Sequence, residues 1–439
     1  MNAKILVGVT DHLDPEEQAM LLAMYSRTFA SIESRLPTTQ EETNSLKQRL
    51  GKFYVGYGHK SVGQLGTTTI FLEGVSQIAA KAIEDTPLFN GQESSTRYID
   101  YSTQPLVSYN EEIAQWQARF MDLYQRALPE TIAKVSAEYP LEAQGDNVAR
   151  ITYVNTVNAR AFDICRGILP AGSTTNVGFS GTFDTLNDQF GKLLYHPASE
   201  VQELASAVLE ELGKKYPSAS YPKEKHLQRN EHKKEPSNFY YTPDSPPEYA
   251  GALEFDSILK NRQLLESFPA RNKFEEYPRQ VASKLVMTYT ALLDFGGYRD
   301  IHRHRRGYCS MPVVAPEKGI HTFYLTQLPD SIAAEFQELF NNYKKWFNDT
   351  QLSIYEKQYA TPMGAVVCFE YTCDINQALY IAELRSGKTV HQTVRQYAQD
   401  LTMWLQGWTN QRIAIHADKS YDNFTLKRGE QTFSQEAMS

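Results

Sequence analysis

The sequence predicts a mixed α+β fold that occurs twice within one chain of 439 residues. The main observation is that one order of segments stands on both sides of a polar stretch: amphipathic helix, proline, a run rich in β-branched and aromatic residues, and a further helix. Two landmarks keep nearly one spacing, since Pro362 follows Pro170 by 192 positions and Arg385 follows Lys192 by 193. Such a constant spacing indicates an internal duplication.

The polar stretch, Gly213–Tyr249, separates the two halves. It is rich in proline and lysine, and no helical or strand period persists in it. Its basic residues are typical of a solvated linker, although they would also suit an anion. We therefore expect a first repeat over residues 1–212, a linker over 213–249 and a second repeat over 250–439.

Helices are predicted where bulky side chains recur every three or four positions. In the first half this pattern covers about Glu111 to Leu128, with Ile113, Trp116, Phe120 and Tyr124. In the second half the same spacing joins Ile332, Phe336, Phe340 and Tyr343. Further amphipathic helices are expected over 186–212 and 377–408, and strands over 67–72 and 285–289. Each repeat should thus be a mixed sheet with long packed helices.

Composition narrows the class of protein. Apolar residues make up 41% of the chain and charged residues 22%, as in ordinary globular proteins. The net charge of −8 argues against a general nucleic-acid binder. No apolar run reaches the roughly 20 residues that span a bilayer, and the N-terminus does not have the pattern of a signal peptide. The four cysteines form no CxxC pair, which fits a reducing compartment, so we expect a cytoplasmic protein. From the net charge and the absence of a spanning run we expect no nucleic-acid or membrane partner.

Arg97 follows several hydroxyl side chains, in the segment Gln92-Glu93-Ser94-Ser95-Thr96-Arg97-Tyr98. An arginine beside hydroxyls is suited to an oxygen-rich anion such as phosphate. Glu93 would orient the arginine or accept a hydrogen bond from a ligand. The alternative is a surface loop with an exposed ion pair.

A second cluster of positive charge lies in Tyr298-Arg299-Asp300-Ile301-His302-Arg303-His304-Arg305-Arg306. On an extended segment Arg303 and Arg305 would share one side, with His304 and Arg306 on the other. Such a run suits phosphates, acidic partners or anionic cofactors. A metal held by the histidines is not expected, because Asp300 is the one acidic residue beside them.

Together these motifs resemble the signature of the flavin-dependent thymidylate synthases. That family has an RHRxxSxNExSxRY motif, preceded by a GHxS/T loop and followed by ARxxLP and LR helices. Gly58-His59-Lys60-Ser61 resembles the flavin-facing loop, and residues 92–98 resemble the NExSxRY tail. The segment Cys165-Arg166-Gly167-Ile168-Leu169-Pro170 is similar to ARxxLP. Arg303-His304-Arg305 matches RHR, and Leu384-Arg385 looks like the late LR.

Each half departs from the family where the other conforms. In the first half residues 83–87 read IEDTP where RHR should stand, and Lys192 replaces the late arginine. In the second half no SxRY follows RHR, and Gln358 replaces the arginine before the proline. Asp374 and Asn376 stand where the family has an asparagine and an arginine that touch the flavin. We predict one kind of composite site built from both repeats; the alternative is decay of both copies.

The resemblance implies conversion of dUMP to dTMP, with methylenetetrahydrofolate as carbon donor and FAD, reduced by NADPH, as hydride source. It implies catalytic roles for Arg385, Ser95 and Arg97, with Arg385 stabilising charge on the uracil carbonyls. Substrate contacts would come from Glu93, Ser95, Thr96, Arg97, Arg166, Arg299 and Arg385. Flavin contacts would come from His59, Ser61, Arg303, His304, Arg305 and Asn376. Two repeats per chain would form a homodimer that mimics the family's tetramer. The alternative is an inactive or altered nucleotide-binding paralogue.

Overall fold

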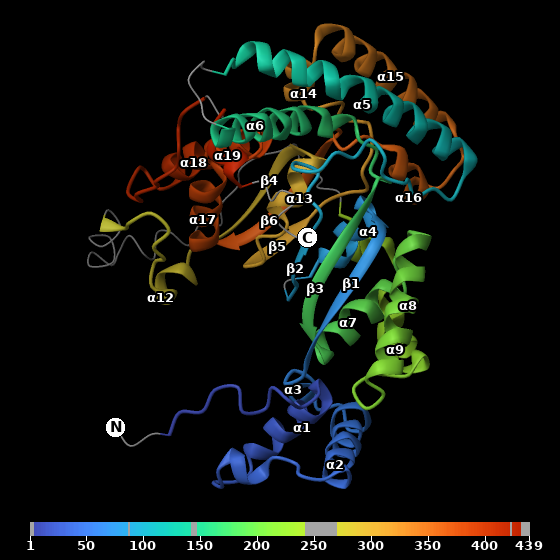
Figure 1. The fold of residues 1–439 in the computed structure, drawn as a ribbon, viewed down its shortest axis with the longest axis vertical. Coiled ribbons are helices and arrows are strands. Elements are labelled where there is room, and N and C mark those ends of the chain that lie inside the picture. Colours follow the sequence, from blue (N-terminus) through green and yellow to red (C-terminus); the bar gives the residue numbers. More distant parts are fainter. Residues whose placement is uncertain (1–3, 87, 142–146, 242–269, 422–423, 432–439) are drawn as a thin grey trace. The chain divides into compact units, whose positions relative to one another are not determined.

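A computed structural model describes residues 4–86, 88–141, 147–241, 270–421 and 424–431 (Figure 1). The chain divides into two compact units. Unit 1 consists of Met1–Glu73, Ala82–Glu93 and Asn176–Phe239, and unit 2 of Gly74–Lys81, Ser94–Thr175 and Tyr240–Ser439. These units follow a different division from the two sequence halves, so the repeat boundaries stay a prediction. Among the described helices none is long and apolar enough to cross a bilayer.

Unit 1 begins with short helices whose ends are defined by side-chain caps. In α1 (Pro15–Tyr25) and α2 (Gln40–Leu50), Asp14 and Thr39 form capping boxes that satisfy free backbone amides of the first turn. A π-helical turn, Gly51–Gly56, and α3 (Lys60–Gly63) follow. The single helix expected over residues 186–212 is instead two, α7 (Phe183–Leu193) and α8 (Ser199–Lys215). Pro197 lies in the break, because proline disfavours helix at the residue before it.

The stretch expected to be a linker shows no helical period in its sequence, yet it is partly helical in the structure. It contains α9 (Lys223–Asn230), in which His226 and Asn230 are buried. The amide of Asn187 on α7 donates to Ala219 O at 2.8 Å and accepts from Tyr221 N at 3.2 Å. These contacts are non-local, so local composition could not predict them. Residues 242–249 lie outside the described residues.

The two sheets share one topology. In the first, β1 (Thr67–Ser76), β2 (Asn90–Glu93) and β3 (Thr174–Thr182) lie in the order β1-β3-β2. In the second, β4 (Val286–Asp294), β5 (Gly307–Ser310) and β6 (Val366–Asp374) lie in the order β4-β6-β5. The central strands pair antiparallel with their neighbours where register is defined. Both predicted strands are confirmed, and the mixed α+β fold with them.

The element boundaries give the duplication a register. A spacing of 192 relates β3 to β6, α7 to α17 (Ile375–Arg385), and the turn Arg166–Ile168 to Gln358–Ala360. The helix expected over 377–408 is accordingly two, α17 and α18 (Gln392–Trp408). This register corrects one pairing: the counterpart of Arg385 is the buried Leu193, not Lys192.

Unit 2 packs its long helices through aromatic side chains. The predicted helices are confirmed as α5 (Glu111–Glu138) and α15 (Asp330–Asp349), which lie side by side in Figure 1. Phe120 contacts Phe336 and Tyr343, with ring centroids 6.3 and 5.5 Å apart. The helix α5 continues past Pro129 because its later turns bury Thr131 and Val135. The other helices are α4 (Gln77–Glu84), which extends into unit 1, α6 (Asn147–Cys165), α12 (Arg279–Ala282), α13 (Phe295–Ile301), α14 (Thr322–Gln327), α16 (Ile354–Lys357) and α19 (Lys427–Glu430).

At the core of unit 2 the two repeats cross through reciprocal backbone hydrogen bonds, and Pro170 pairs with Pro362. Each bond has a counterpart 192 positions away: Ala171 N to Thr361 O matches Met363 N to Leu169 O, at 2.9 and 2.8 Å. Likewise Gly172 N to Tyr359 O, at 2.7 Å, matches Gly364 N to Gly167 O, at 2.9 Å. The two copies therefore meet as a self-complementary pair, as subunits do in a two-fold dimer.

Candidate functional site

Arg97, the predicted phosphate ligand, lies against a buried carboxylate on α6. Its Nε donates to Asp163 Oδ1 at 2.9 Å, and its Nη2 donates to Thr389 O at 3.0 Å. Arg428 binds the same carboxylate, with Nη2 2.7 Å from Asp163 Oδ1. Burial raises the pKa of Asp163, but the two guanidinium groups outweigh it and hold the pKa well below its usual range. Residues from both halves of the sequence thus meet at Arg97.

Arg166, from the ARxxLP-like segment, is buried in a network with the second repeat. Its Nη2 donates to Asp294 Oδ2 at 3.1 Å, and Tyr324 Oη donates to the same oxygen at 2.7 Å. Asp294 also caps α13 by accepting from Gly297 N. A buried guanidinium needs such partners, because an unpaired charge is costly away from water.

Asp300 joins the remaining arginines. Arg303 Nη2 donates to its Oδ1 at 2.7 Å, Arg385 Nη1 lies 3.8 Å from Oδ1, and Arg166 Nη1 lies 3.9 Å from Oδ2. Burial raises the pKa of Asp300, but four guanidinium groups outweigh the burial and hold the pKa far below its ordinary value: those of Arg385, Arg303, Arg97 and Arg166. Arg166 from the first half of the sequence and Arg303 and Arg385 from the second therefore lie around one carboxylate.

Arg385, the predicted catalytic residue, is fixed at the end of α17. Its Nε donates to His304 Nε2 at 2.8 Å, and its Nη2 donates to Asp300 O at 2.9 Å. Burial and the neighbouring Arg385 lower the pKa of His304 well below its usual value, which keeps the ring neutral. The Arg385 side chain is 19% exposed, so a rigid cation is presented at the surface of the cluster.

The cluster has more positive than negative charge. Five guanidinium groups stand against three carboxylates; the arginines are 97, 166, 303, 385 and 428, and the carboxylates belong to Asp163, Asp294 and Asp300. Two positive charges are left within this set, the charge that a phosphate monoester dianion would balance.

The other predicted substrate residues take different places. Ser95 Oγ accepts from Arg97 N at 3.2 Å, so it shapes the loop that carries the arginine. Thr96 and Arg299 are buried in unit 2. Glu93 belongs to unit 1 and ends β2.

The predicted flavin residues are divided between the units. His59 and Ser61 lie in unit 1, at the start of α3, and Arg303, His304, Arg305 and Asn376 lie in unit 2. The amide of Asn376 is engaged with the backbone of Tyr277, accepting at 2.8 Å and donating at 3.0 Å. The expected alternation is wrong for one pair, because His304 is buried whereas Arg306 is exposed and binds Glu276. Residues 302–305 form a turn and loop rather than a strand.

The symmetry-related arrangement has lost its charges. The counterparts of Arg166 and Arg385 are Gln358 and Leu193. Gln358 is buried and donates to Tyr240 Oη at 3.1 Å, while Tyr240 stacks on Tyr355 with centroids 5.7 Å apart. One arginine cluster of this type therefore forms per chain within the described residues.

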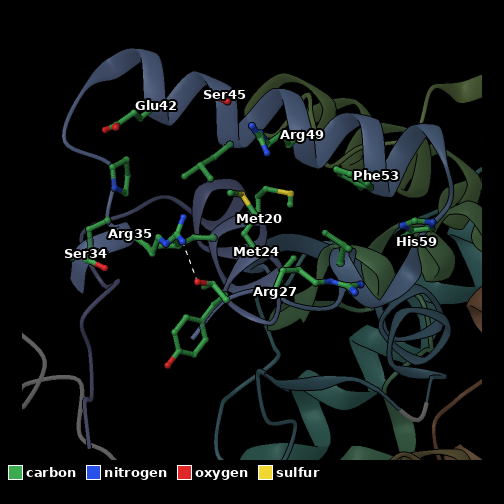
Figure 2. Close-up of a pocket in the computed structure, with 18 residues that line it drawn as sticks. Met20, Met24, Arg27, Ser34, Arg35, Glu42, Ser45, Arg49, Phe53 and His59 are labelled. Atoms are coloured by element: carbon green, nitrogen blue, oxygen red, sulfur yellow. Dashed lines mark hydrogen bonds between the residues drawn. The ribbon is translucent and has the colours of Figure 1, made fainter. Parts of the chain in front are cut away.

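A cavity of about 640 Å³ opens in unit 1 (Figure 2). Its apolar lining includes Met20, Met24 and Phe53, and three arginines reach its rim: Arg27, Arg35 and Arg49. Arg35 donates to Thr28 Oγ1 at 3.0 Å, whereas Arg27 and Arg49 form no ion pair among the described residues. His59 lines one end, beside Phe53 with ring centroids 5.9 Å apart. The carboxylate of Glu42 also lines the cavity, so the three arginines stand against one acidic group. A cavity with an apolar floor and such an excess of cations suits a planar ligand that carries phosphate.

Sequence patterns assigned no role to the carboxylates that organise the cluster, although Asp300 had been noted beside the histidines. Asp163 precedes Arg166 by one helical turn on α6, and Asp300 follows Arg299 directly, so both had a weak local signal. Arg428 had none, because it comes from α19 far along the chain. Among the described residues no group of three or more His, Cys, Asp and Glu could hold a metal ion.

A buried histidine beside the cluster should make the stability of the fold depend on pH. His391 Nδ1 accepts from Thr393 N at 3.3 Å, and its Nε2 contacts Asp163 O at 3.0 Å, so the ring is neutral. Burial is the main cause that lowers the pKa of His391 to about 3. Since the folded pKa lies below the unfolded one, its stabilising contribution is complete near neutrality and is lost as pH falls.

We expect that contribution to fall by about 2 kcal/mol between about pH 7 and about pH 5, because the unfolded histidine binds a proton there. Urea unfolding at both pH values measures it. His391→Gln should reduce the pH dependence, whereas an unchanged dependence would show that His391 does not carry it.

The fold is α+β, and its arginine cluster is chemically suited to an anionic ligand. Residues 8–218 match the family model of thymidylate synthase complementing protein. This match confirms the resemblance to the flavin-dependent thymidylate synthases over this part of the chain.

Relatives match most of the chain. A UPF0159 protein of Chlamydia pneumoniae is 26% identical over 418 aligned positions, which cover 81% of this chain and 78% of the relative. A UPF0159 protein of Thermoplasma acidophilum is 22% identical and covers 87% and 91%. Among solved structures, the flavin-dependent thymidylate synthase ThyX of Helicobacter pylori, complexed with FAD and dUMP, is 15% identical. It covers 47% of this chain and 94% of its own, with a TM-score of 0.27.

Proposed function

We propose that this protein is a flavin-dependent thymidylate synthase-type enzyme, with one composite nucleotide site per chain. The observation that carries the proposal is the convergence of Arg97 and Arg166 with Arg303 and Arg385 around Asp300. Two of these arginines come from each repeat. The proposed substrate is dUMP, whose phosphate would balance the excess positive charge of the cluster.

Within this proposal each residue has a physical task. Arg97, held by Asp163, would bind the phosphate, and Ser95 would keep its loop in place. Arg385 would stabilise negative charge that develops on the uracil carbonyls, since its hydrogen bonds to His304 and Asp300 fix it before the substrate arrives. Arginine remains charged at neutral pH even when buried.

The flavin is supported by some residues and opposed by others. The unit 1 cavity at His59, with Arg27, Arg35 and Arg49, has the apolar floor and cations that a flavin dinucleotide needs. When bound, FAD would supply the hydride, with NADPH as its reductant and methylenetetrahydrofolate as the carbon donor. His304 and Asn376 are engaged within the protein, so we assign them to positioning rather than to flavin contact. We further propose a homodimer, which light scattering of the purified protein would test.

A nucleotide assay tests the site. dUMP is expected to raise the melting temperature and deoxyuridine is not, because ligand binding stabilises the folded state and the phosphate supplies the contacts. Arg97→Gln should remove the dUMP effect, whereas Arg306→Gln, a surface arginine paired with Glu276, should retain it. Equal stabilisation by deoxyuridine, or an unchanged effect in the Arg97 variant, would contradict the proposed site.

One observation favours a second function. Three carboxylates already neutralise much of the cluster, and Asn376 is engaged with Tyr277, so the protein is also consistent with nucleotide binding without turnover. Incubation with dUMP, FAD, NADPH and methylenetetrahydrofolate separates the two functions. dTMP formation supports the enzyme, whereas dUMP binding with no flavin uptake and no dTMP supports the binding protein.

A further inference from the structure

A second cavity, of about 390 Å³, lies in unit 2 among α6, α14 and the start of α18. Its lining is mostly polar and includes Arg160, His321, Thr326, Gln327, Gln392 and Gln396. None of these residues belongs to the arginine cluster described above. The cavity is therefore a separate candidate for ligand binding.

Arg160 has an unusual position for a guanidinium group. It is 8% exposed, and it forms no ion pair among the described residues. Its Nη2 donates to the neutral Gln327 Oε1 at 2.8 Å, its group lies 5.5 Å from the centre of the Phe323 ring, and its Nη1 has no hydrogen-bond partner. Burial is the largest cause acting on the pKa of Arg160 and lowers it. Asp163 attracts this guanidinium at longer range, but no carboxylate of the described residues pairs with it directly. Buried charges in proteins are normally paired, so the position is suited to an anionic ligand.

The opposite wall adds a second, independent feature. The helix α18, 17 residues long, begins at this cavity with Gln392 and Thr393. Helix N-termini attract anions through the helix dipole and through uncapped amides. The amide of Thr393 already donates to His391 Nδ1 at 3.3 Å, so the helix dipole is the main attraction that this end offers. The Oε1 atom of Gln392 is buried without a partner, which leaves an acceptor for a hydroxyl or N–H of the ligand.

We propose that this cavity binds a small oxyanion, phosphate or carboxylate, with Arg160 as its charged anchor and the start of α18 as its second contact. A hydrogen phosphate ion would satisfy both unpaired groups, because its oxygens accept from Arg160 and its hydroxyl donates to Gln392. The ligand is thus either free phosphate or the anionic group of a small metabolite. The site does not depend on the nucleotide function proposed above.

Melting temperatures of the full chain test the proposal, with sodium phosphate and sodium acetate compared with sodium chloride at equal ionic strength. One of the two oxyanions is expected to raise the melting temperature by about 2 °C at roughly ten times its Kd. Arg160→Gln should abolish this rise. Arg150→Gln is the matched control, because Arg150 is an exposed residue of the same helix.

Gln392→Glu provides a test that does not remove the arginine. A carboxylate at this position would take the place of the ligand, so this variant should melt higher in chloride and no longer respond to phosphate or acetate. Its result decides the case if Arg160→Gln does not fold.

Repeating the titration with saturating dUMP separates the two anion sites, because phosphate bound at the Arg97 cluster would then be displaced. The proposal would be overturned if dUMP abolished the rise in melting temperature with phosphate or acetate while the Arg160→Gln variant still showed it. The absence of any response beyond that to chloride would also overturn it. If dUMP itself does not bind, the proposed function fails, while an Arg160-dependent response would still stand.

Discussion

Arg385→Ala is expected to lower dTMP formation by at least about a hundredfold, because a single fixed donor to a developing oxyanion contributes about that much in comparable sites. Two hydrogen bonds, to His304 and to the backbone oxygen of Asp300, hold the Arg385 guanidinium group in one orientation. Arg385→Lys should lose nearly as much, since an ammonium group cannot make the two planar contacts. The measurement is the initial rate of dTMP formation with dUMP in excess.

The matched control is Arg306→Ala, which removes a surface arginine that binds Asp374 and Glu276. It should leave the rate close to that of the wild type. Circular dichroism and the melting temperature establish that each variant is folded. A folded Arg385→Ala protein with the wild-type rate would exclude Arg385 from the reaction.

Gly364→Val is expected to lower the free energy of unfolding by about 4 kcal/mol or more, the range of severe core disruption. A Cβ at Gly364 would lie 2.8 Å from Gly167 O and 3.0 Å from Gly167 Cα, so it would meet backbone atoms that cannot rotate away. The same bond between the repeats, Gly364 N to Gly167 O, would be forced apart. Urea unfolding followed by fluorescence measures the loss, and insoluble expression would be its extreme form.

Gly407 offers the control for that substitution. It lies in α18 of the same unit, and a Cβ there would meet no atom within 4 Å. Gly407→Val should therefore change the free energy of unfolding by less than about 1 kcal/mol. Similar losses in the two variants would mean that crowding at the crossing of the repeats does not limit stability.

Part of the candidate site could be predicted from sequence because its residues occur in short motifs. Arg97 beside hydroxyls and the run from Arg303 to Arg305 each have a local pattern, and the complementary losses pointed to a composite site. The partners that hold these arginines had little local pattern. Asp163 and Arg428 are 265 positions apart, yet they share one ion pair.

The Lys192 pairing illustrates a further limit. Two basic residues at nearly the same spacing suggested that lysine replaced arginine, but the helix boundaries align Arg385 with Leu193. The loop between α17 and α18 is one residue longer than the loop between α7 and α8. Spacing alone cannot place this extra residue, whereas the structure places it in a loop, because loops accept insertions that helices do not. The element boundaries located it.

By itself the sequence determined the α+β class and the principal helices and strands, because these follow from periodicity and residue type. From spacing and residue type it also predicted a duplication and an anion site. Only the tertiary structure decided that arginines of both halves meet around Asp300, that Gln358 and Leu193 stand at the counterparts of Arg166 and Arg385, and that Arg160 is buried without an ion pair among the described residues. The physical reason is that these features depend on contacts between residues far apart in the chain, where burial makes the energy of each charge depend on its partners.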